Sequence, residues 1–113
     1  MILPFLGGII ITKLINMKAI FITYNQAHTE KVEYMLDRLE IRGFTQWSNV
    51  LGRGSETGSP HMGTHTWPEI NSATLTIVED EKVDVVLDKV QKLNSINEEV
   101  GIRAFVWDIL KTV

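Results

Sequence analysis

The chain contains no cysteine, and this absence removes several kinds of chemistry together. Disulfide bonds, thiolate metal sites and a cysteine nucleophile are all excluded. The sequence also lacks an excess of basic residues: its formal net charge is −3 at pH 7, and no Lys/Arg cluster of the kind that neutralises a phosphate backbone is present. We therefore expect no nucleic-acid partner, and a reducing cytoplasmic location fits a chain without disulfides.

No apolar run is long enough to cross a bilayer as a helix of about 20 residues. The first sixteen residues are apolar, but four residues interrupt them: Pro4, Gly7, Gly8 and Lys13. A basic leader and a small-residue cleavage site, which a signal peptide needs, are both missing. Because Met17 opens directly onto a strand pattern, residues 1–16 are interpreted as an N-terminal extension before the true start, with an extra strand or an interface arm as the alternative. The domain then covers residues 17–113.

The first half of this domain predicts a strand, a helix and a second strand. Residues 18–24 form a short β-branched and aromatic run, typical of a central strand. From residue 26 to residue 41, apolar residues recur at steps of three and four, which predicts an amphipathic helix with Gly43 as its C′ residue. Residues 44–51 are again rich in strand formers.

The second half repeats this order with clearer signals. Residues 72–78 alternate, with Ala73, Leu75 and Ile77 on one face of a strand. An acidic run, residues 79–81, predicts the cap and first turn of a second helix. That helix carries one apolar stripe, made of Val83, Val86, Leu87, Val90 and Leu93. Residues 102–110 alternate and end the fold as a fourth strand.

The resulting order is βαββαβ, which predicts an α+β, ferredoxin-like fold. Such a fold has a four-stranded antiparallel sheet with both helices on one face. The opposite sheet face then has no cover within the chain, although one strand register places Trp47, Leu75 and Trp107 on it. An uncovered apolar face predicts an oligomer.

The long loop between strands two and three, residues 52–68, is rich in glycine and proline and calls for a functional explanation. The run Gly52-Arg53-Gly54 puts flexible backbone N–H groups beside a guanidinium, a combination suited to an anion. A plain turn is the alternative interpretation.

The same loop holds the chain's one concentration of possible metal ligands: His61, His65, Glu56 and Glu69, with His28 as a further candidate. Histidines four residues apart share a face only in a helix, and the proline and glycine around them argue against helix. The alternative is that His65 and Trp67 fold back and pin the base of the loop.

Three motifs give the chain its resemblance to the PII-like signalling (nitrogen regulatory protein P-II) superfamily, and more narrowly to its divergent bacterial branch. They are Gly52-Arg53-Gly54 after strand two, Gly63-Thr64-His65-x-Trp67-Pro68-x-x-Asn71 before strand three, and Gly101-Ile102-Arg103-Ala104-Phe105-Val106 at the end. The resemblance covers essentially everything from Lys18 to the C-terminus.

This resemblance implies a homotrimer built around the sheet faces, with a small effector bound in the clefts between subunits. The loop 52–68 corresponds to the family's T-loop, which reaches a target protein, for example a membrane transporter. The effector and loop residues that the resemblance implies are Gly52, Arg53, Gly54, Gly63, Thr64, His65, Trp67 and Arg103. Such proteins act by a population shift rather than by catalysis.

Two departures from the family pattern limit the cofactor prediction. Well-known members hold ATP phosphates in a glycine-rich turn before the last strand, whereas this chain has Glu98 and Glu99 there, which would repel a polyphosphate. An adenine nucleotide or another anion can still use Arg53 and Arg103. The loop also contains no tyrosine, so the tyrosyl modification of well-known members is excluded in it.

Two other function classes compete with the regulatory one. The alternative is a trimeric divalent-metal-binding protein of the metal-tolerance type, which would use the loop histidines. An enzyme ranks last, because no nucleophile–base constellation, phosphate-binding loop or dinucleotide fingerprint is present.

Overall fold

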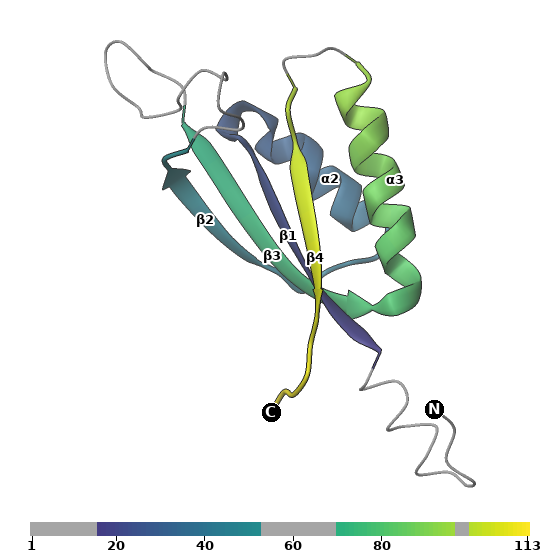
Figure 1. The fold of residues 1–113 in the computed structure, drawn as a ribbon. Coiled ribbons are helices and arrows are strands. Elements are labelled where there is room, and N and C mark those ends of the chain that lie inside the picture. Colours follow the sequence, from purple (N-terminus) through teal and green to yellow (C-terminus); the bar gives the residue numbers. More distant parts are fainter. Residues whose placement is uncertain (1–15, 53–69, 97–99) are drawn as a thin grey trace, which may run out of the picture.

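A four-stranded antiparallel sheet, in the order β2-β3-β1-β4, carries two α-helices on one of its faces (Figure 1). The computed structural model describes residues 16–52, 70–96 and 100–113. The strands are β1 (Met17–Asn25), β2 (Thr45–Val50), β3 (Asn71–Glu79) and β4 (Arg103–Asp108). The helices are α2 (Thr29–Arg38) and α3 (Val83–Asn94), preceded by the 3-10 turns η1 (Gln26–His28) and η2 (Asp80–Lys82). The predicted ferredoxin-like βαββαβ fold is confirmed.

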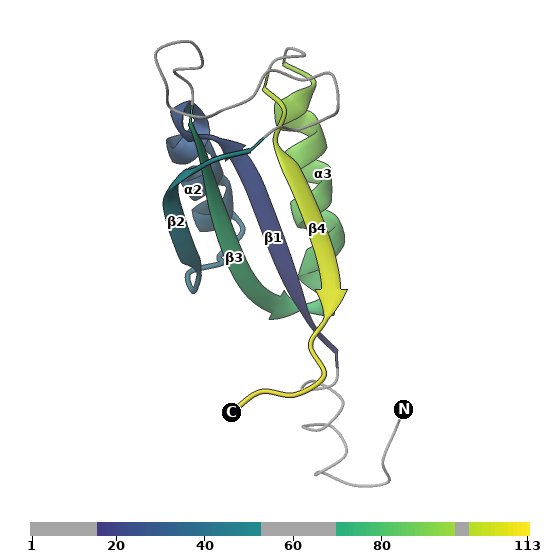
Figure 2. The ribbon, with the colours of Figure 1, turned by 60° about the vertical axis from the view of Figure 1, so that its left-hand side comes forward.

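The core lies between the helices and the sheet face that they cover (Figure 2). Alternation along β1 turns Ile20, Ile22 and Tyr24 toward this side, where none is more than 1% exposed. The helices contribute the predicted stripes, of which five members are buried: Val32, Met35, Leu36, Val86 and Val90. Full burial of one such side chain contributes about 1.5–3 kcal/mol. The covered face is therefore the main source of stability within one chain.

Two threonines of β3 point into the covered side, and both are hydrogen-bonded. The hydroxyl oxygens of Thr74 and Tyr24 lie 2.7 Å apart, and Gln46 Nε2 donates to the Tyr24 hydroxyl at 3.2 Å. The Thr76 hydroxyl donates to the Gly43 carbonyl at 2.7 Å. Because a buried polar group is costly mainly when it lacks a partner, these threonines are compatible with a core. They also confirm the alternation predicted for residues 72–78.

α2 ends earlier than the sequence predicts, in a Schellman motif. The Glu40 N–H donates to the Asp37 carbonyl at 3.0 Å, and the Ile41 N–H donates to the Leu36 carbonyl at 2.9 Å. Glu40 has φ 60°, in the left-handed region that usually selects glycine. The prediction of Gly43 as the C′ residue was wrong, because the buried Ile41 closes the motif before the chain reaches the glycine.

The start of α3 also differs in detail from the prediction. Asp80 and Glu81 lie in the 3-10 turn η2, and α-helical geometry begins at Val83. Glu79 occupies the predicted N-cap position, before η2, but makes no side-chain capping hydrogen bond. Asp80 and Glu81 follow in the predicted acidic first turn, where carboxylates favour the helix dipole. Lys82 Nζ donates to the Leu39 carbonyl at 2.6 Å and links the start of α3 to the end of α2.

A cluster of charges closes the end of the sheet opposite to the long loop. Lys18 Nζ contacts the Asp108 carboxylate and lies 3.8 Å from that of Asp80. The hydrogen bond to Asp108 raises the pKa of Lys18 above its ordinary value of 10.5, against a smaller opposing effect of desolvation. Beyond the last residue of β4, the Ile109 N–H still donates to the Met17 carbonyl at 3.1 Å. β4 is therefore shorter than the predicted range of 102–110. The chain nevertheless remains hydrogen-bonded to β1 for one residue beyond the end of β4.

Candidate functional site

The end of the sheet that carries the long loop brings together segments that are far apart in the sequence (Figure 1). Strands β1 and β2 finish at this end, and strands β3 and β4 begin there. The strand registers pair Asn25 with Asn71, and Thr23 with Arg103. Gly52 and Arg103, two of the predicted effector residues, therefore share one end of the sheet.

A bulge in β2 directs the chain toward the start of β3. Trp47 pairs with Ala73, but Val50 pairs with Asn71, so β2 uses one residue more than β3 over this interval. Asn49 takes up the irregularity with φ 58°, a conformation that asparagine adopts more readily than most residues. The bulge sets the direction in which the chain enters the long loop.

Gly52 lies so close to β3 that its lack of a side chain matters. A Cβ atom at this position would come within 3.1 Å of the Asn71 side-chain nitrogen. At the other end of the loop, the Gln26 N–H donates to the Ile70 carbonyl at 2.8 Å. Both ends of the loop are thus fixed against the sheet by close approach and by backbone hydrogen bonding.

Asn94 fixes the segment that leads into β4. Its side-chain amide donates to the Ile102 carbonyl at 2.8 Å, and its side-chain oxygen accepts from the Ile102 N–H at 2.8 Å. This two-sided pairing joins the last residue of α3 to the residue before β4. Gly101, with φ 58°, allows the turn that the pairing requires. The position of Arg103 at the start of β4 follows from this clamp.

Arg103 lies exposed on the side of the sheet that the helices leave open. Its guanidinium carbon is 5.5 Å from the centroid of the Phe105 ring, a distance typical of a cation–π contact. The contact directs the side chain along β4, an edge strand of the sheet. A guanidinium at this place can bind a carboxylate, a bicarbonate or a phosphate through paired N–H groups.

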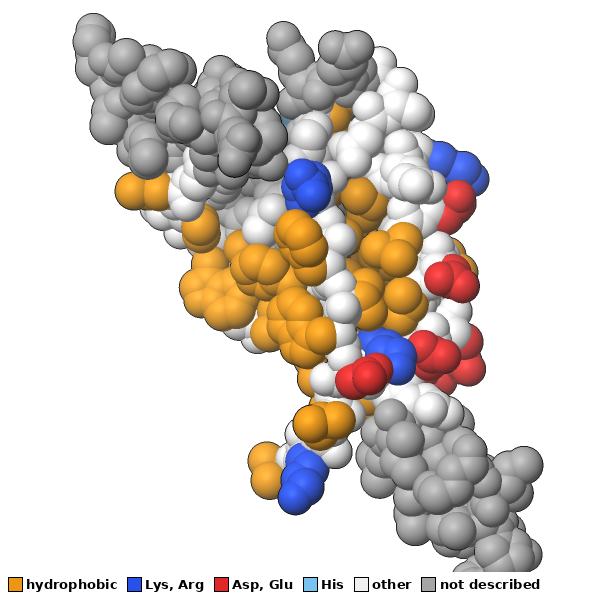
Figure 3. Space-filling model, viewed as in Figure 1, with side chains coloured by type: hydrophobic (Ala, Val, Ile, Leu, Met, Phe, Trp, Pro, Cys, Tyr) orange, Lys and Arg blue, Asp and Glu red, His pale blue; other side chains and the backbone are white. Residues whose placement is uncertain are grey.

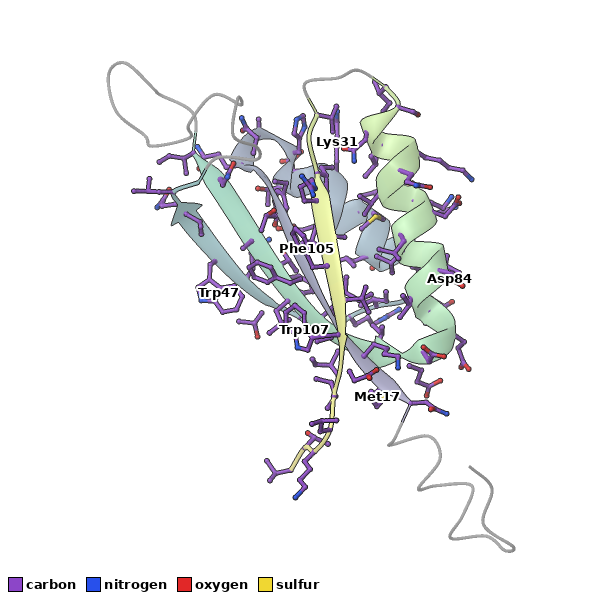
Figure 4. All side chains as sticks on the ribbon, in the orientation of Figure 1. Met17, Lys31, Trp47, Asp84, Phe105 and Trp107 are labelled. Atoms are coloured by element: carbon purple, nitrogen blue, oxygen red, sulfur yellow. The ribbon has the colours of Figure 1, made fainter. Side chains whose placement is uncertain are left out.

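An apolar patch covers the open face next to Arg103 (Figure 3). Phe21 lies at its centre, with ring centroids 6.4 Å from Trp47 and 6.3 Å from Trp107. Trp47 and Trp107 are 45% and 48% exposed and stand on the same side of the sheet as Phe105 (Figure 4). Leu75 lies beside Phe21 in the register, so the predicted grouping of two tryptophans and a leucine on the uncovered face is confirmed. We call this patch the open apolar face: Phe21, Trp47, Leu75, Ile77, Phe105 and Trp107.

The remaining predicted site residues lie outside the described residues. For the effector and loop these are Arg53, Gly54, Gly63, Thr64, His65 and Trp67; for the metal they are His61, His65, Glu56 and Glu69. His28 lies half-buried in η1, at the loop end of the sheet. Within the part of the chain that the structure describes, no group of three or more His, Cys, Asp or Glu side chains could hold a metal ion. The metal site stays a prediction.

Sequence reasoning missed the Asn94 clamp and the Asn49 bulge. The signal for the clamp was an asparagine at the end of a predicted helix, eight residues before the start of a strand pattern. Such a spacing predicts a short connection, but not that its two ends are joined through a side chain. The bulge had no comparable signal, because the run from 44 to 51 contains several strand formers on both sides of Asn49.

Comparisons with known proteins agree with this geometry. Residues 17–113 match the family model described as nitrogen regulatory protein P-II. CPII, a PII-like protein from Thiomonas intermedia, is 25% identical with a TM-score of 0.67 in a structure bound to ADP, AMP and bicarbonate; the alignment covers 82% of this chain and 85% of that one. A second structure of CPII, bound to ADP and bicarbonate, gives 27% identity and a TM-score of 0.66 with the same coverage.

More distant structures share the fold. PII from Arabidopsis thaliana, bound to citrate, is 16% identical with a TM-score of 0.59, and the alignment covers 83% of this chain and 78% of that one. A comparison with curated protein sequences finds no match. Since the family model spans the whole fold from β1 to the C-terminus, the chain belongs to the nitrogen regulatory protein P-II family.

Proposed function

We propose that this protein is a trimeric regulator that binds a small anionic effector in clefts between subunits and acts on a partner protein through the loop 52–68. The observation that carries the proposal is the open apolar face with Arg103 at its loop end. Family membership supports the regulatory role, because PII proteins are signalling proteins. An enzymatic role has no comparable support.

The trimer is supported by the exposure of large side chains that a monomer has no reason to expose. Trp47, Phe105 and Trp107 are each close to half exposed, and they lie on one face of the sheet, on either side of Phe21. Contiguous apolar patches of this kind mark association surfaces. Proteins of this family are typically homotrimers that bind partner proteins, and the same face is the one that a ferredoxin-like chain leaves without a helix layer.

The effector class follows from the chemistry at the loop end and from the ligands of the solved relatives. CPII is described with ADP, AMP and bicarbonate, all of which are anions. When subunits meet through their open faces, Arg103 lies at the rim of the contact, where it can bind an anion held by two chains. A nucleotide with few phosphates, or bicarbonate, fits this place better than a polyphosphate, because Glu98 and Glu99 follow α3 in the sequence.

The mechanism is a population shift of the loop 52–68. Its two ends are fixed to the sheet at Gly52 and Ile70, at the same end of the sheet as the place proposed for the effector. An effector that prefers one loop conformation shifts the loop toward that conformation by its differential affinity. The partner protein, for which a membrane transporter is the family analogy, then binds one loop state more tightly. The lack of disulfides supports a cytoplasmic location for this exchange.

Calorimetric titration of the purified protein with ADP, AMP and bicarbonate tests the effector site. We expect saturable binding of at least one of them, and a weakening of about tenfold or more in Arg103→Ala, because a charge-assisted hydrogen bond contributes roughly 1.5–3 kcal/mol. Arg42→Ala is the matched control, since Arg42 is exposed and lies outside this end of the sheet. No binding by any of the three anions, or equal weakening in both variants, contradicts the proposal.

The same titration, repeated with zinc and other divalent metals, tests the alternative of a metal-binding protein. If the alternative is correct, a divalent metal binds saturably, and this binding is lost in the double variant His61→Ala/His65→Ala. In that case the titrations with ADP, AMP and bicarbonate show no binding. Binding of anions with no metal binding favours the regulatory proposal.

A further inference from the structure

A groove runs between the two helices, on the opposite side of the molecule from the open apolar face. Its volume is about 420 Å³. Side chains from both helices, and from the turn after α3, line it: Lys31, Tyr34, Met35, Arg38, Leu39, Lys89, Lys92, Leu93 and Ile96. We call it the α2–α3 groove. Because it lies on the helix layer, assembly through the open sheet face leaves it accessible.

The groove is strongly basic in a chain that is acidic overall. Four of its lining residues are cations and none is a carboxylate, whereas the whole chain has a formal net charge of −3. Lys92 is paired with Asp88 at 3.1 Å, which offsets part of its charge. Lys31 and Lys89 make no ion pair within the described residues. The groove thus keeps an uncompensated positive charge that faces solvent.

Helix stability explains only part of this charge. Arg38 and Lys92 lie in the last turns of α2 and α3, where cations interact favourably with the helix dipole. Lys31 lies in the first turn of α2, where a cation is unfavourable for the same reason. Lys89 lies before the last turn of α3. These two lysines therefore need another explanation. One lies on each wall of the groove, Lys31 on α2 and Lys89 on α3.

The groove also offers apolar contact surface between its charges. Tyr34 and Ile96 are 65% and 64% exposed, and the buried Met35 forms part of the floor. The Arg38 guanidinium carbon lies 5.9 Å from the centroid of the Tyr34 ring, which holds this cation beside an aromatic face. Apolar side chains bordered by cations are complementary to a ligand with an apolar stripe and acidic flanks.

The length of the groove indicates the kind of ligand. Its lining residues span 31–39 on α2 and 89–96 on the other wall, which corresponds to roughly 12 Å at 1.5 Å per helical residue. This is about two turns of a third helix, the span of the anchors at i, i+4 and i+7 that a helix lays into a groove. A small ligand, in contrast, is usually enclosed over most of its surface, and the exposed rim of this groove cannot enclose one.

We propose that the α2–α3 groove binds an acidic amphipathic helix of a partner protein. None of the residues that line this surface belongs to the loop 52–68, and Arg103 is not among them. Lys31 and Lys89 contact the acidic flanks of the bound helix, while Tyr34, Leu93 and Ile96 contact its apolar stripe. A partner can thus be held at two places, by the loop at one end of the sheet and by the helix layer at its side.

The test uses the full chain and a synthetic helical peptide with leucine on one face and glutamate on its flanks. A twin peptide with lysine in place of glutamate is the first control. We expect NMR shift changes confined to the groove residues with the acidic peptide and none with the basic one. Fluorescence anisotropy gives the dissociation constant, which should rise about tenfold in Lys31→Glu/Lys89→Glu, since each exposed ion pair contributes modestly and reversal adds repulsion.

A matched variant, Arg42→Glu/Lys111→Glu, changes the net charge by the same amount at exposed positions outside the groove. It should bind the acidic peptide within about twofold of the parent, as should Arg103→Ala. Equal weakening in both double variants would mean that the peptide responds to net charge alone and would overturn the proposal. Shift changes that map elsewhere, or that AMP or inorganic phosphate reproduces in the groove, would overturn it as well.

Discussion

Both faces of the sheet carry large apolar side chains, but the chain covers only one of them. On the helix side, Ile20 and Ile22 are fully buried beneath α2 and α3. On the other side, Trp47 and Trp107 remain close to half exposed around Phe21. The same alternation along the strands produces both faces. The difference shows that folding of one chain depends on the covered face, whereas the open face is available for association.

The largest effect is expected from a deletion on the covered face. Leu36→Ala removes a fully buried side chain between α2 and the sheet, so the free energy of unfolding should fall by about 2–5 kcal/mol. Urea denaturation followed by circular dichroism measures this loss. Leu110→Ala, the same substitution at a position that is 90% exposed, should change it by less than about 0.5 kcal/mol. Similar losses of stability in the two variants would contradict the claim that folding depends on the covered face.

The second prediction concerns the open face, where the effect is on association. Trp107→Glu puts a carboxylate into the open apolar face, and burial of an unpaired charge in the proposed contact costs several kcal/mol. We expect single chains that keep the helix and strand content of the parent. Light scattering and circular dichroism measure the two properties on one sample. Leu110→Glu is the matched charge control, and dissociation in this variant too would argue against a specific face.

A smaller effect, and of opposite sign, is expected at the end of α2, which completes the covered face. Glu40 has φ 60° without being glycine, and this conformation strains a residue with a side chain. Glu40→Gly should therefore raise the free energy of unfolding by about 0.5–1 kcal/mol. Glu30→Gly, in the first turn of the same helix, should lower it, because glycine is a poor helix former and the change removes a carboxylate that favours the helix dipole. A loss of stability in Glu40→Gly would show that the left-handed residue is not strained.

The smallest effect is expected at the charge cluster around Lys18. The hydrogen bond to Asp108 raises the pKa of Lys18, so its contribution to stability is fully present below the ordinary value of 10.5 and is lost as the pH rises through the raised value. Asp108→Asn should therefore lower the urea midpoint slightly near neutral pH. This difference from the parent should disappear at a pH well above 10.5. A difference that is independent of pH would assign the effect to packing instead.

The fold could be predicted from the sequence because the hydrophobic residues of its strands and helices recur at regular intervals. Alternation at 72–78 and the stripe through Val86 and Val90 leave one arrangement in which both helices cover the same sheet face. The end of α2 could not be predicted in this way. Glycine is the usual residue at φ near 60°, so Gly43 was the natural choice, whereas burial of Ile41 imposes the conformation on Glu40.

The candidate site was predictable only where topology alone decides position. Antiparallel order brings the end of β2 and the start of β4 to one end of the sheet, so it already predicts that Gly52 and Arg103 lie at that end, Gly52 just after one edge strand and Arg103 on the other. The Asn94 clamp depends on the length of one connection, and the α2–α3 groove depends on how far apart two helices lie on a sheet. Neither the length of this connection nor the distance between the helices can be predicted from the pattern of hydrophobic residues.

The most direct test of the central claim is the mass of the parent protein in solution. If the open apolar face is an association surface of the PII type, size-exclusion chromatography with light scattering gives three times the 12.8 kDa of one chain. The mass should be constant over a wide range of protein concentration. A stable species with the mass of one chain, and with Trp47 and Trp107 exposed in it, would contradict the account.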